Sequence, residues 1–316
     1  MNSIEVKSLT KKFGSFTSVN DISFEVREGE VFGFLGSNGA GKSTTIKMLC
    51  GILAPTSGDA LVGGFSINKD TDLVKRNIGY MSQKFSLYND LTVSENINFF
   101  GGIYGLFGNK LEERKSWVIR IADLYGKEEH LTSSLAVGFK QRLALGCAVI
   151  HEPQIVFLDE PTGGVDPVSR RKFWDLINEL SDKGITVFVT THYLDEAEFC
   201  NRIILINGGK LIASGSPKEL KEEYIKNPVY EIDCSDIYKA VKVLENGLFT
   251  DNVTIFGNSI HVSLKSSPEF KVNQPENDIE MLNVFLEKEN GLKVLRIQKI
   301  SPSLEDVFVH LIESKK

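Results

Sequence analysis

A glycine-rich stretch near the N-terminus has the residue types and spacing of a phosphate-binding loop. It consists of Gly36, Ser37, Asn38, Gly39, Ala40, Gly41, Lys42, Ser43 and Thr44. The glycines let the backbone bend so that successive N–H groups point at phosphate oxygens. Lys42 brings a mobile positive charge to the β- and γ-phosphates of a nucleotide, and the hydroxyl of Ser43 can ligate Mg²⁺. A chance glycine-rich turn is disfavoured, because the loop lies between a predicted strand and a predicted helix, as this chemistry requires.

Two carboxylates, Asp159 and Glu160, follow an apolar run at residues 155–158. The run predicts a buried strand in the centre of a parallel sheet, and ligands bind at the carboxyl ends of such strands. Asp159 can hold Mg²⁺, directly or through water, and Glu160 can orient or deprotonate a water that attacks the γ-phosphate. The alternative is a helix-capping Asp-Glu pair, which the phosphate-binding loop in the same chain disfavours.

Three further residues could touch a nucleotide, and each has an ordinary structural alternative. Gln83 follows a predicted strand, and its neutral amide can contact Mg²⁺ or the attacking water, unless it is a solvated loop residue. His192 lies just past the predicted strand at residues 186–190 and could sense the γ-phosphate, although a lone histidine is usually structural. Phe13, in the loop between the first two strands, could stack on an adenine ring, although a lone phenylalanine is more often core.

The composition bounds the class of protein. A chain of 316 residues predicts about two domains. The net charge of −6 argues against nucleic acid as a partner. The four scattered cysteines fit a reduced cytoplasmic protein better than a disulfide framework or a zinc site. We find neither an apolar run of the ~20 residues that a membrane-spanning helix needs nor an apolar signal region, so the chain is expected not to cross a membrane.

The elements that must position these residues predict an α/β first domain at residues 1–224. Strands alternate with helices, and a helical insertion is expected at about residues 86–150, where Thr92 and Glu95 form a capping box. Within that insertion a helix beginning near Ala136 would point its first N–H groups outward, ready for a phosphate.

A second domain is predicted at residues 225–316. A strand at 229–234 precedes a helix capped by Ser235 and a hairpin across Gly257-Asn258. A helix at 278–288, a strand at 294–300 and a last helix opened by Ser303 follow. The order β-α-β-β-α-β predicts a small α+β domain of the ferredoxin-like type.

The order of these motifs resembles the ATP-binding cassette, the nucleotide-binding subunit of ABC transporters. The resemblance covers roughly the first two thirds of the chain, and it implies a RecA-like core with an antiparallel β subdomain and a helical subdomain. It also implies that ATP and Mg²⁺ lie between the phosphate-binding loop of one cassette and the signature helix of a second cassette. In this arrangement Phe13 stacks on adenine, Ala136 and Gly138 face the partner's nucleotide, and Asp166 lies in the loop that crosses the dimer.

The signature helix departs from the family pattern. The family sequence is Leu-Ser-Gly-Gly-Gln, whereas this chain has Leu135, Ala136, Val137, Gly138 and Phe139. The serine hydroxyl is missing and one of the two glycines remains. Some bacterial exporter cassettes look similarly altered, and we expect weaker engagement of the partner's γ-phosphate.

The resemblance implies an ATP-hydrolysing subunit that powers export through a separately encoded integral-membrane permease. Its partners would be that permease and a second cassette, identical or different, and it would lie in the cytoplasm on the inner face of the cell membrane through the permease. The C-terminal domain resembles the extensions of drug and polymer exporters, with a role in dimer support, regulation or small-molecule sensing. Two alternatives stay open: a soluble cassette protein that remodels ribosomes or DNA, and a P-loop kinase.

Overall fold

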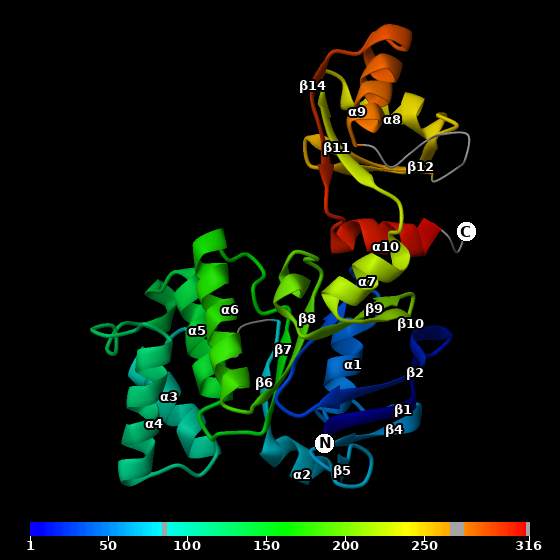
Figure 1. The fold of residues 1–316 in the computed structure, drawn as a ribbon. Coiled ribbons are helices and arrows are strands. Elements are labelled where there is room, and N and C mark those ends of the chain that lie inside the picture. The colour runs from blue at the N-terminus through cyan, green and yellow to red at the C-terminus, as the bar shows by residue number, and fades with distance from the viewer. Residues whose placement is uncertain (84–86, 266–274, 314–316) are drawn as a thin grey trace. The chain divides into compact units, whose positions relative to one another are not determined.

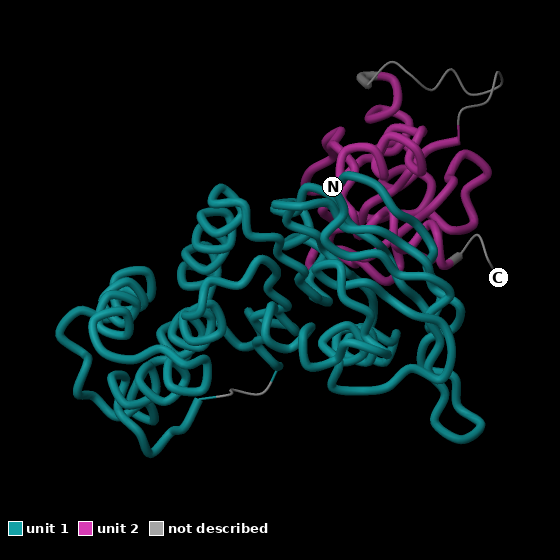
Figure 2. Tube along the Cα trace, turned by 90° about the horizontal axis from the view of Figure 1, so that it is seen from below, with its two compact units in different colours: residues 1–216 teal, residues 217–316 magenta. Residues whose placement is uncertain are grey.

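The computed structural model describes residues 1–83, 87–265 and 275–313. It divides into two compact units, residues 1–216 and residues 217–316 (Figure 2). Residue 86, where the helical insertion is expected to begin, lies outside the described residues, as do residues 314–316.

The boundary between the units differs from the one expected from the sequence. From the sequence, the first domain is predicted to end at residue 224 and so to include the helix α7 (Pro217–Tyr224). The structure instead divides the chain before α7, because this helix packs against α10 (Leu304–Glu313) of the second unit.

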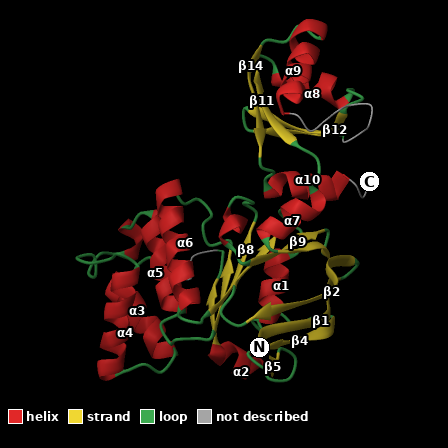
Figure 3. Ribbon diagram, in the orientation of Figure 1, coloured by secondary structure: helices red, strands yellow, loops and turns green. Residues whose placement is uncertain are grey.

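The centre of the first unit is a mainly parallel sheet of six strands (Figure 3). In spatial order these are β10 (Lys210–Gly215), β9 (Arg202–Asn207), β3 (Val31–Leu35), β8 (Thr186–Thr191), β7 (Ile155–Asp159) and β6 (Ile78–Met81). All neighbours are parallel except β9 and β10, which form a hairpin. Every residue of β3, β7 and β8 is buried, as continuous apolar runs predict for central parallel strands.

The register of this sheet determines where the functional side chains lie. Leu35 at the end of β3 pairs with Thr191 on β8, and Asp159 at the end of β7 pairs with Thr190. Met81 of β6 pairs with Leu158 of β7. The carboxyl ends of β3, β8, β7 and β6 are therefore neighbours, and the segments that follow them meet at one edge.

A second, antiparallel sheet covers the other side of the first helix. Its order is β2 (Phe16–Arg27), β1 (Asn2–Phe13), β4 (Ser57–Val62) and β5 (Phe65–Ser66). Apolar residues of this sheet, of β3 and of α1 (Lys42–Leu49) form a single buried cluster, which holds α1 between the two sheets. The short strand β5 and the following helix α2 (Thr71–Asn77) are not expected from the sequence.

The helical part of the first unit lies beside the parallel sheet (Figure 1), and its last helix packs on β8 and β3 of that sheet. It contains α3 (Val93–Ile103), α4 (Gly108–Ile121), the 3₁₀ segment η1 (Thr132–Ser134), α5 (Val137–Ala148) and α6 (Pro167–Asp182). The expected capping box is present, since Thr92 accepts from the N–H of Glu95 and Glu95 accepts from that of Thr92. A second 3₁₀ segment, η2 (Glu196–Phe199), follows β8. None of the described helices is long and apolar enough to cross a membrane.

The second unit is an antiparallel sheet with helices in the order β-α-β-β-α-β, followed by α10. Its elements are β11 (Val229–Cys234), α8 (Ile237–Glu245), β12 (Thr250–Phe256), β13 (Ser259–Leu264), α9 (Pro275–Asn283), the π-helix η3 (Val284–Glu289) and β14 (Val294–Ile300). The spatial order of the strands is β12-β13-β11-β14, with every pair antiparallel. This topology supports the ferredoxin-like assignment, which stays a prediction.

Of two local expectations for the second unit, the cap of α8 is wrong and the helix at residues 278–288 is confirmed. Asp236, not Ser235, caps α8, because its carboxylate accepts from the N–H of Lys239 at 2.9 Å. Ser235 instead pairs with Lys293, whose carbonyl accepts from its backbone N–H. The helix expected at 278–288 is α9 continued by a π-helix.

A buried ion pair joins the sheet of the second unit to α10. His261 on β13 lies 3.0 Å from a carboxylate oxygen of Asp306 and 3.7 Å from one of Glu231. Burial lowers the pKa of His261, but the hydrogen bond and charge of Asp306 and the charge of Glu231 outweigh this, so the pKa is raised. Burial opposes the shift at Asp306 too, yet hydrogen bonds from His261 and Ser303 lower its pKa.

We expect the second unit to lose stability as the pH rises above about 6.5. A raised histidine pKa contributes stability that is complete below the unfolded value of about 6.5 and is lost as the pH rises through the folded value. The lowered pKa of Asp306 contributes stability that is complete above the unfolded value of about 3.9 and is lost as the pH falls through the folded value. The ion pair therefore stabilises the unit most between about pH 3.9 and 6.5. The loss for one proton stays below about 1.4 kcal/mol per pH unit.

The measurement is hydrogen exchange of peptides from β13 and α10, expressed as protection factors at each pH. His261→Asn should remove the pH dependence, whereas His310→Asn, which changes a histidine outside this cluster, should retain it. Equal pH dependence in the His261 variant would contradict the assignment.

Candidate functional site

The glycine-rich loop connects β3 to α1 in the conformation that its sequence predicts. A side chain at Gly36 would place its Cβ 2.2 Å from the carbonyl oxygen of Ile206, so only glycine fits there. Gly41 has a φ of +109°, and its Cβ would lie 2.6 Å from the carbonyl oxygen of Ser18. Residues 37–39 are exposed at the tip of the loop, directly before the N-terminus of α1. A bend of this kind at a helix N-terminus fits the phosphates of a nucleotide.

Lys42 is held inside the loop that precedes it. Its side chain is 4% exposed, and its ammonium group donates to the carbonyl oxygens of Gly36 at 2.8 Å and Ser37 at 3.1 Å. The same group lies 3.3 Å from a carboxylate oxygen of Glu160. The only side-chain cation within the loop therefore faces the carboxylates at the end of β7.

Asp159 has an oxygen-rich environment that fits a magnesium ion. The hydroxyls of Ser43 and Thr190 donate to one of its carboxylate oxygens at 3.0 Å and 2.7 Å. Burial raises its pKa, and these two hydrogen bonds oppose the shift only in part. In the described part of the chain no three His, Cys, Asp or Glu residues form a metal-binding group. Mg²⁺ usually takes one or two protein oxygens and completes its shell with water and phosphate oxygens, so Ser43 and Asp159 fit it.

Glu160 is the residue on which the other predicted site residues converge. Its φ of +48° is rare for a residue with a side chain, and its backbone N–H donates to both the carbonyl and the hydroxyl of Thr190. Gln83 donates its side-chain N–H to the Glu160 carboxylate at 2.9 Å. His192 lies 3.3 Å from the same oxygen, but its buried Nδ1 has no hydrogen-bond partner among the described residues. The structure therefore brings Gln83, Lys42 and His192 together around one carboxylate.

Phe13 is not a core residue. Its side chain is 49% exposed at the end of β1, and the ammonium group of Lys11 lies 5.2 Å from the centre of its ring. An exposed aromatic face beside a cation is available for stacking on a base.

The residues expected to contact a partner's nucleotide lie away from the loop of their own chain. Ala136 is the exposed N-cap of α5, and Val137 is 41% exposed. Figure 1 shows α5 among α3, α4 and α6, apart from α1. Gly138 is buried, and a Cβ there would lie 2.6 Å from the side chain of Ser169 on α6. Close packing of α5 on α6 therefore requires glycine at this position, a reason that the sequence analysis missed.

Asp166 begins the helix α6. Its carboxylate accepts from the backbone N–H of Ser169 at 3.0 Å, and hydrogen bonds from Ser169 lower its pKa. The side chain is exposed, so its segment is accessible to another molecule.

A buried carboxylate that the sequence analysis missed connects two loops of the site. Glu196 is 1% exposed and accepts hydrogen bonds from Thr162 at 2.5 Å and Thr191 at 2.8 Å. Burial raises its pKa, while these hydrogen bonds and the charge of Arg170 at 3.5 Å oppose the shift. Thr162 follows Glu160 by two residues, and Thr191 directly precedes His192. Glu196 thus links the segment that follows Glu160 to the segment that precedes His192.

A phosphate-binding loop and paired carboxylates on a mainly parallel sheet define a P-loop nucleotide-binding protein. Residues 19–163 match the ABC transporter family. The linearmycin resistance ATP-binding protein LnrL of Bacillus subtilis is 33% identical over 98% of this chain and 97% of its own length. The Nod factor export ATP-binding protein I of Rhizobium etli is 34% identical over 98% of this chain and 93% of its own length. The chain therefore belongs to the family of ABC transporter ATP-binding proteins.

Other relatives match about two thirds of the chain. The probable multidrug ABC transporter ATP-binding protein YbhF of Escherichia coli is 54% identical over 220 residues, which are 70% of this chain and 38% of YbhF. The solved ATP-binding subunit of an ABC transporter has a TM-score of 0.64 at 29% identity, covering 70% of this chain and 92% of that one. A dimeric ATP-binding cassette in a post-hydrolysis state has a TM-score of 0.62 at 27% identity, covering 67% and 98%. These structures confirm the predicted cassette fold.

We predict that Glu196→Gln slows nucleotide hydrolysis by up to about 100-fold, since small misplacements of catalytic groups have effects of this size. The amide keeps the shape but presents only one acceptor oxygen to the two threonine hydroxyls, so the loops lose a defined relative position. A positioning role predicts a lower kcat with little change in KM for ATP.

The matched control is Asp195→Asn. Asp195 also lies near Arg170, at 3.6 Å, but it is largely exposed and its carboxylate is not the one that the two threonines contact. This variant should retain nearly full kcat. A loss of kcat in both variants would assign the effect to Arg170, and a rise in KM alone would contradict positioning.

Proposed function

We propose that this chain binds and hydrolyses Mg-ATP and powers export through a separately encoded membrane permease. The observation that carries the proposal is the convergence of Lys42, Asp159 and Glu160 at one edge of the parallel sheet, with Gln83 and His192 beside them. A kinase is less well supported, because Glu160 and His192 stand where a water would be activated rather than where a second substrate would be held.

The phosphates would lie in the loop at residues 36–44, held by backbone N–H groups and by Lys42. Ser43 and Asp159 would hold Mg²⁺, with Gln83 as a further oxygen donor, and the ion would supply positive charge that stabilises the phosphates. The exposed ring of Phe13 would stack on the adenine.

Glu160 would accept the proton of the attacking water. Its backbone is fixed by Thr190, and its carboxylate is oriented by Lys42 on one side and Gln83 on the other. The Nδ1 of His192, which has no hydrogen-bond partner in the described part of the chain, leaves that ring able to adapt its hydrogen bonds to a γ-phosphate.

A second cassette, identical or different, would complete the site. Ala136 and Val137 expose the N-terminus of α5 far from the loop of their own chain, which is the arrangement expected if they face a partner's nucleotide. One of the similar solved cassettes is dimeric. Because Ala136 lacks a hydroxyl, this contact would rest on the helix N-terminus alone.

A row of apolar side chains supports a membrane permease as the other partner. Phe99 and Ile103, four residues apart on α3, are 41% and 60% exposed, and Phe107, the N-cap of α4, is 73% exposed. The ring of Tyr88 contacts that of Phe99 edge-on at 4.7 Å. Exposed apolar side chains that lie together can mark an interaction site. The chain would then lie in the cytoplasm, on the inner face of the cell membrane.

The similar proteins are named for multidrug transport, linearmycin resistance and Nod factor export, so their names indicate no single cargo. None of these three names supports a protein that remodels ribosomes or DNA. For the second unit, we propose dimer support or regulation.

We predict that Glu160→Gln retains Mg-ATP binding and slows hydrolysis by about 10²–10⁴-fold, because the amide preserves shape but cannot accept a proton. Calorimetry gives the affinity and phosphate release gives the rate. With Mg-ATP, the variant should also accumulate as a dimer on size exclusion.

Lys42→Ala provides the contrast, since it should weaken binding itself by roughly 1.5–3 kcal/mol, the range for a hydrogen bond to a charged group. An unchanged turnover in the Glu160 variant would remove this residue from the role of general base.

The permease is tested by affinity capture from detergent-solubilised membranes. The wild-type chain should co-purify with a multi-span membrane protein, and Phe99→Ser with Ile103→Ser should reduce its yield at least about tenfold, as expected when buried apolar anchors are lost. ATPase activity should be unchanged, which separates docking from catalysis.

The matched control is Ile52→Ser with Leu73→Ser, which removes two other apolar side chains that are 55% and 42% exposed. This variant should capture as much membrane protein as the wild type. Recovery of ribosomes in place of a membrane protein would favour the ribosome-remodelling alternative.

A further inference from the structure

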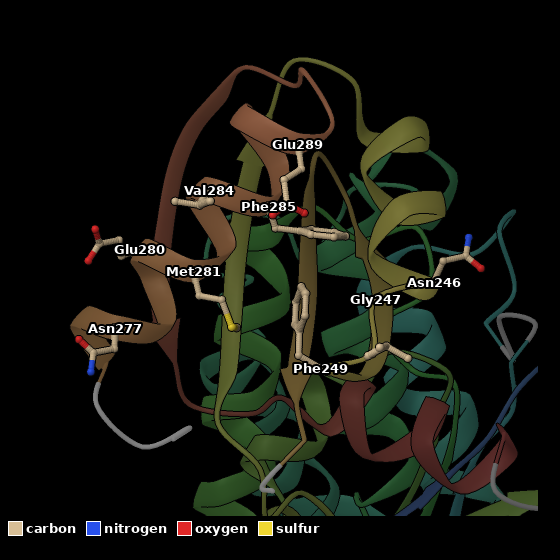
Figure 4. Close-up of a pocket in the computed structure, with 10 residues that line it drawn as sticks. Asn246, Gly247, Phe249, Asn277, Glu280, Met281, Val284, Phe285 and Glu289 are labelled. Carbon is tan, nitrogen blue, oxygen red and sulfur yellow. The ribbon is translucent and has the colours of Figure 1, made fainter. Parts of the chain in front are cut away.

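The second unit contains a cavity of about 690 Å³ between the C-terminal end of α8 and the helix formed by α9 and η3 (Figure 4). It is lined by Asn246, Gly247, Leu248, Phe249, Asn277, Glu280, Met281, Val284, Phe285 and Glu289. This volume lies within the range of about 300–1,000 Å³ that is usual for small-molecule sites. Nothing in the ATPase site uses these residues.

The floor of the cavity is aromatic and apolar. The rings of Phe249 and Phe285 meet edge to face, with centroids 4.9 Å apart. Figure 4 shows Met281 extending toward Phe249 from the neighbouring helix. Methionine is flexible and polarizable, so it adapts to ligands of different shape. Leu248, which is 81% exposed, provides further apolar surface at the mouth.

The helix that forms one wall is irregular at the cavity. Residues Val284–Glu289 adopt a π-helix, which supplies Val284, Phe285 and Glu289 to the lining. Single π-helical turns are uncommon and occur frequently at functional sites. The irregularity thus lies where the cavity is formed.

The ionisable side chains that line the cavity are two glutamates, while the ammonium group of Lys265, outside the lining, donates to the carbonyl oxygen of Leu248 at 3.3 Å. Glu280 and Glu289 are both exposed, and none of the ten lining residues named above carries a positive charge. Figure 4 shows the side chain of Glu289 extending toward the ring of Phe285. A carboxylate beside aromatic faces suits an organic cation, because both the carboxylate and the ring faces attract positive charge.

We propose that this cavity binds an amphipathic organic cation, with its apolar body against Phe249, Phe285 and Met281 and its positive charge near Glu289. Glu280 adds to the negative potential at the rim. The site is formed within the second unit and does not depend on the proposed ATPase activity.

The test is isothermal titration calorimetry of the full chain with tetraphenylphosphonium and tetraphenylborate. These two ions have nearly the same size and shape and opposite charge. We expect saturable one-to-one binding of the phosphonium and at least about tenfold weaker binding of the borate, with a smaller difference at high salt. Thermal unfolding of each variant confirms that the fold is retained.

Two substitutions locate the binding, each with a matched control. Glu280→Gln with Glu289→Gln should weaken phosphonium binding about three- to tenfold, the range for exposed charge pairs. Glu28→Gln with Glu112→Gln removes the same charge from two exposed positions of the first unit and should change phosphonium binding less than about twofold. Leu248→Ser should weaken binding about three- to tenfold through lost apolar contact, whereas Leu295→Ser, at another exposed leucine, should not.

Absence of saturable phosphonium binding up to about 1 mM would overturn the proposal. Equal binding of the borate would overturn the choice of a cation, and equal effects of the control variants would place the binding elsewhere. ATP hydrolysis is not part of the readout, so failure here is distinguishable from failure of the proposed ATPase activity.

Discussion

Two adjacent carboxylates at the buried end of one strand constrain the whole first unit. Burying unpaired charge is costly, so Asp159 and Glu160 each need polar partners. Residues from distant parts of the chain provide them: Ser43 and Thr190 for the aspartate, and Lys42 for the glutamate. Only a sheet in which β8 lies between β3 and β7 brings these partners within reach. The strand order therefore determines which residues surround the two carboxylates.

Much of this arrangement could be predicted from the sequence, because each motif is short and its chemistry depends on local spacing. The loop at residues 36–44 and His192 directly follow buried strands, and the pair at residues 159–160 begins at the last residue of another. The carboxyl ends of parallel strands share one edge. Gln83 follows from the same reasoning, since β6 lies next to β7.

The rest could not be predicted because it depends on contacts between residues far apart in the chain. Glu196 looks like any charged residue after a strand, and its burial becomes evident only when Thr162 and Arg170 are seen beside it. The sequence predicts that Gly138 faces a nucleotide, but in the structure the side chain of Ser169, on another helix, lies where a Cβ of residue 138 would be. The boundary after residue 216 likewise follows from α7 packing on α10, which the sequence of α7 alone does not indicate.

The second unit separates the residues that maintain its fold from those that form its cavity. Ser303 and Asp306 cap the start of α10 and Asp306 pairs with His261, while Leu304 and Val307 of the same stretch are buried. The stretch at residues 303–307 thus holds α10 in place through these contacts. The cavity is formed by the end of α8 and by α9 with η3, elements outside that stretch. Its lining could therefore vary without loss of the contacts that hold α10, which is what a site adapted to different ligands would require.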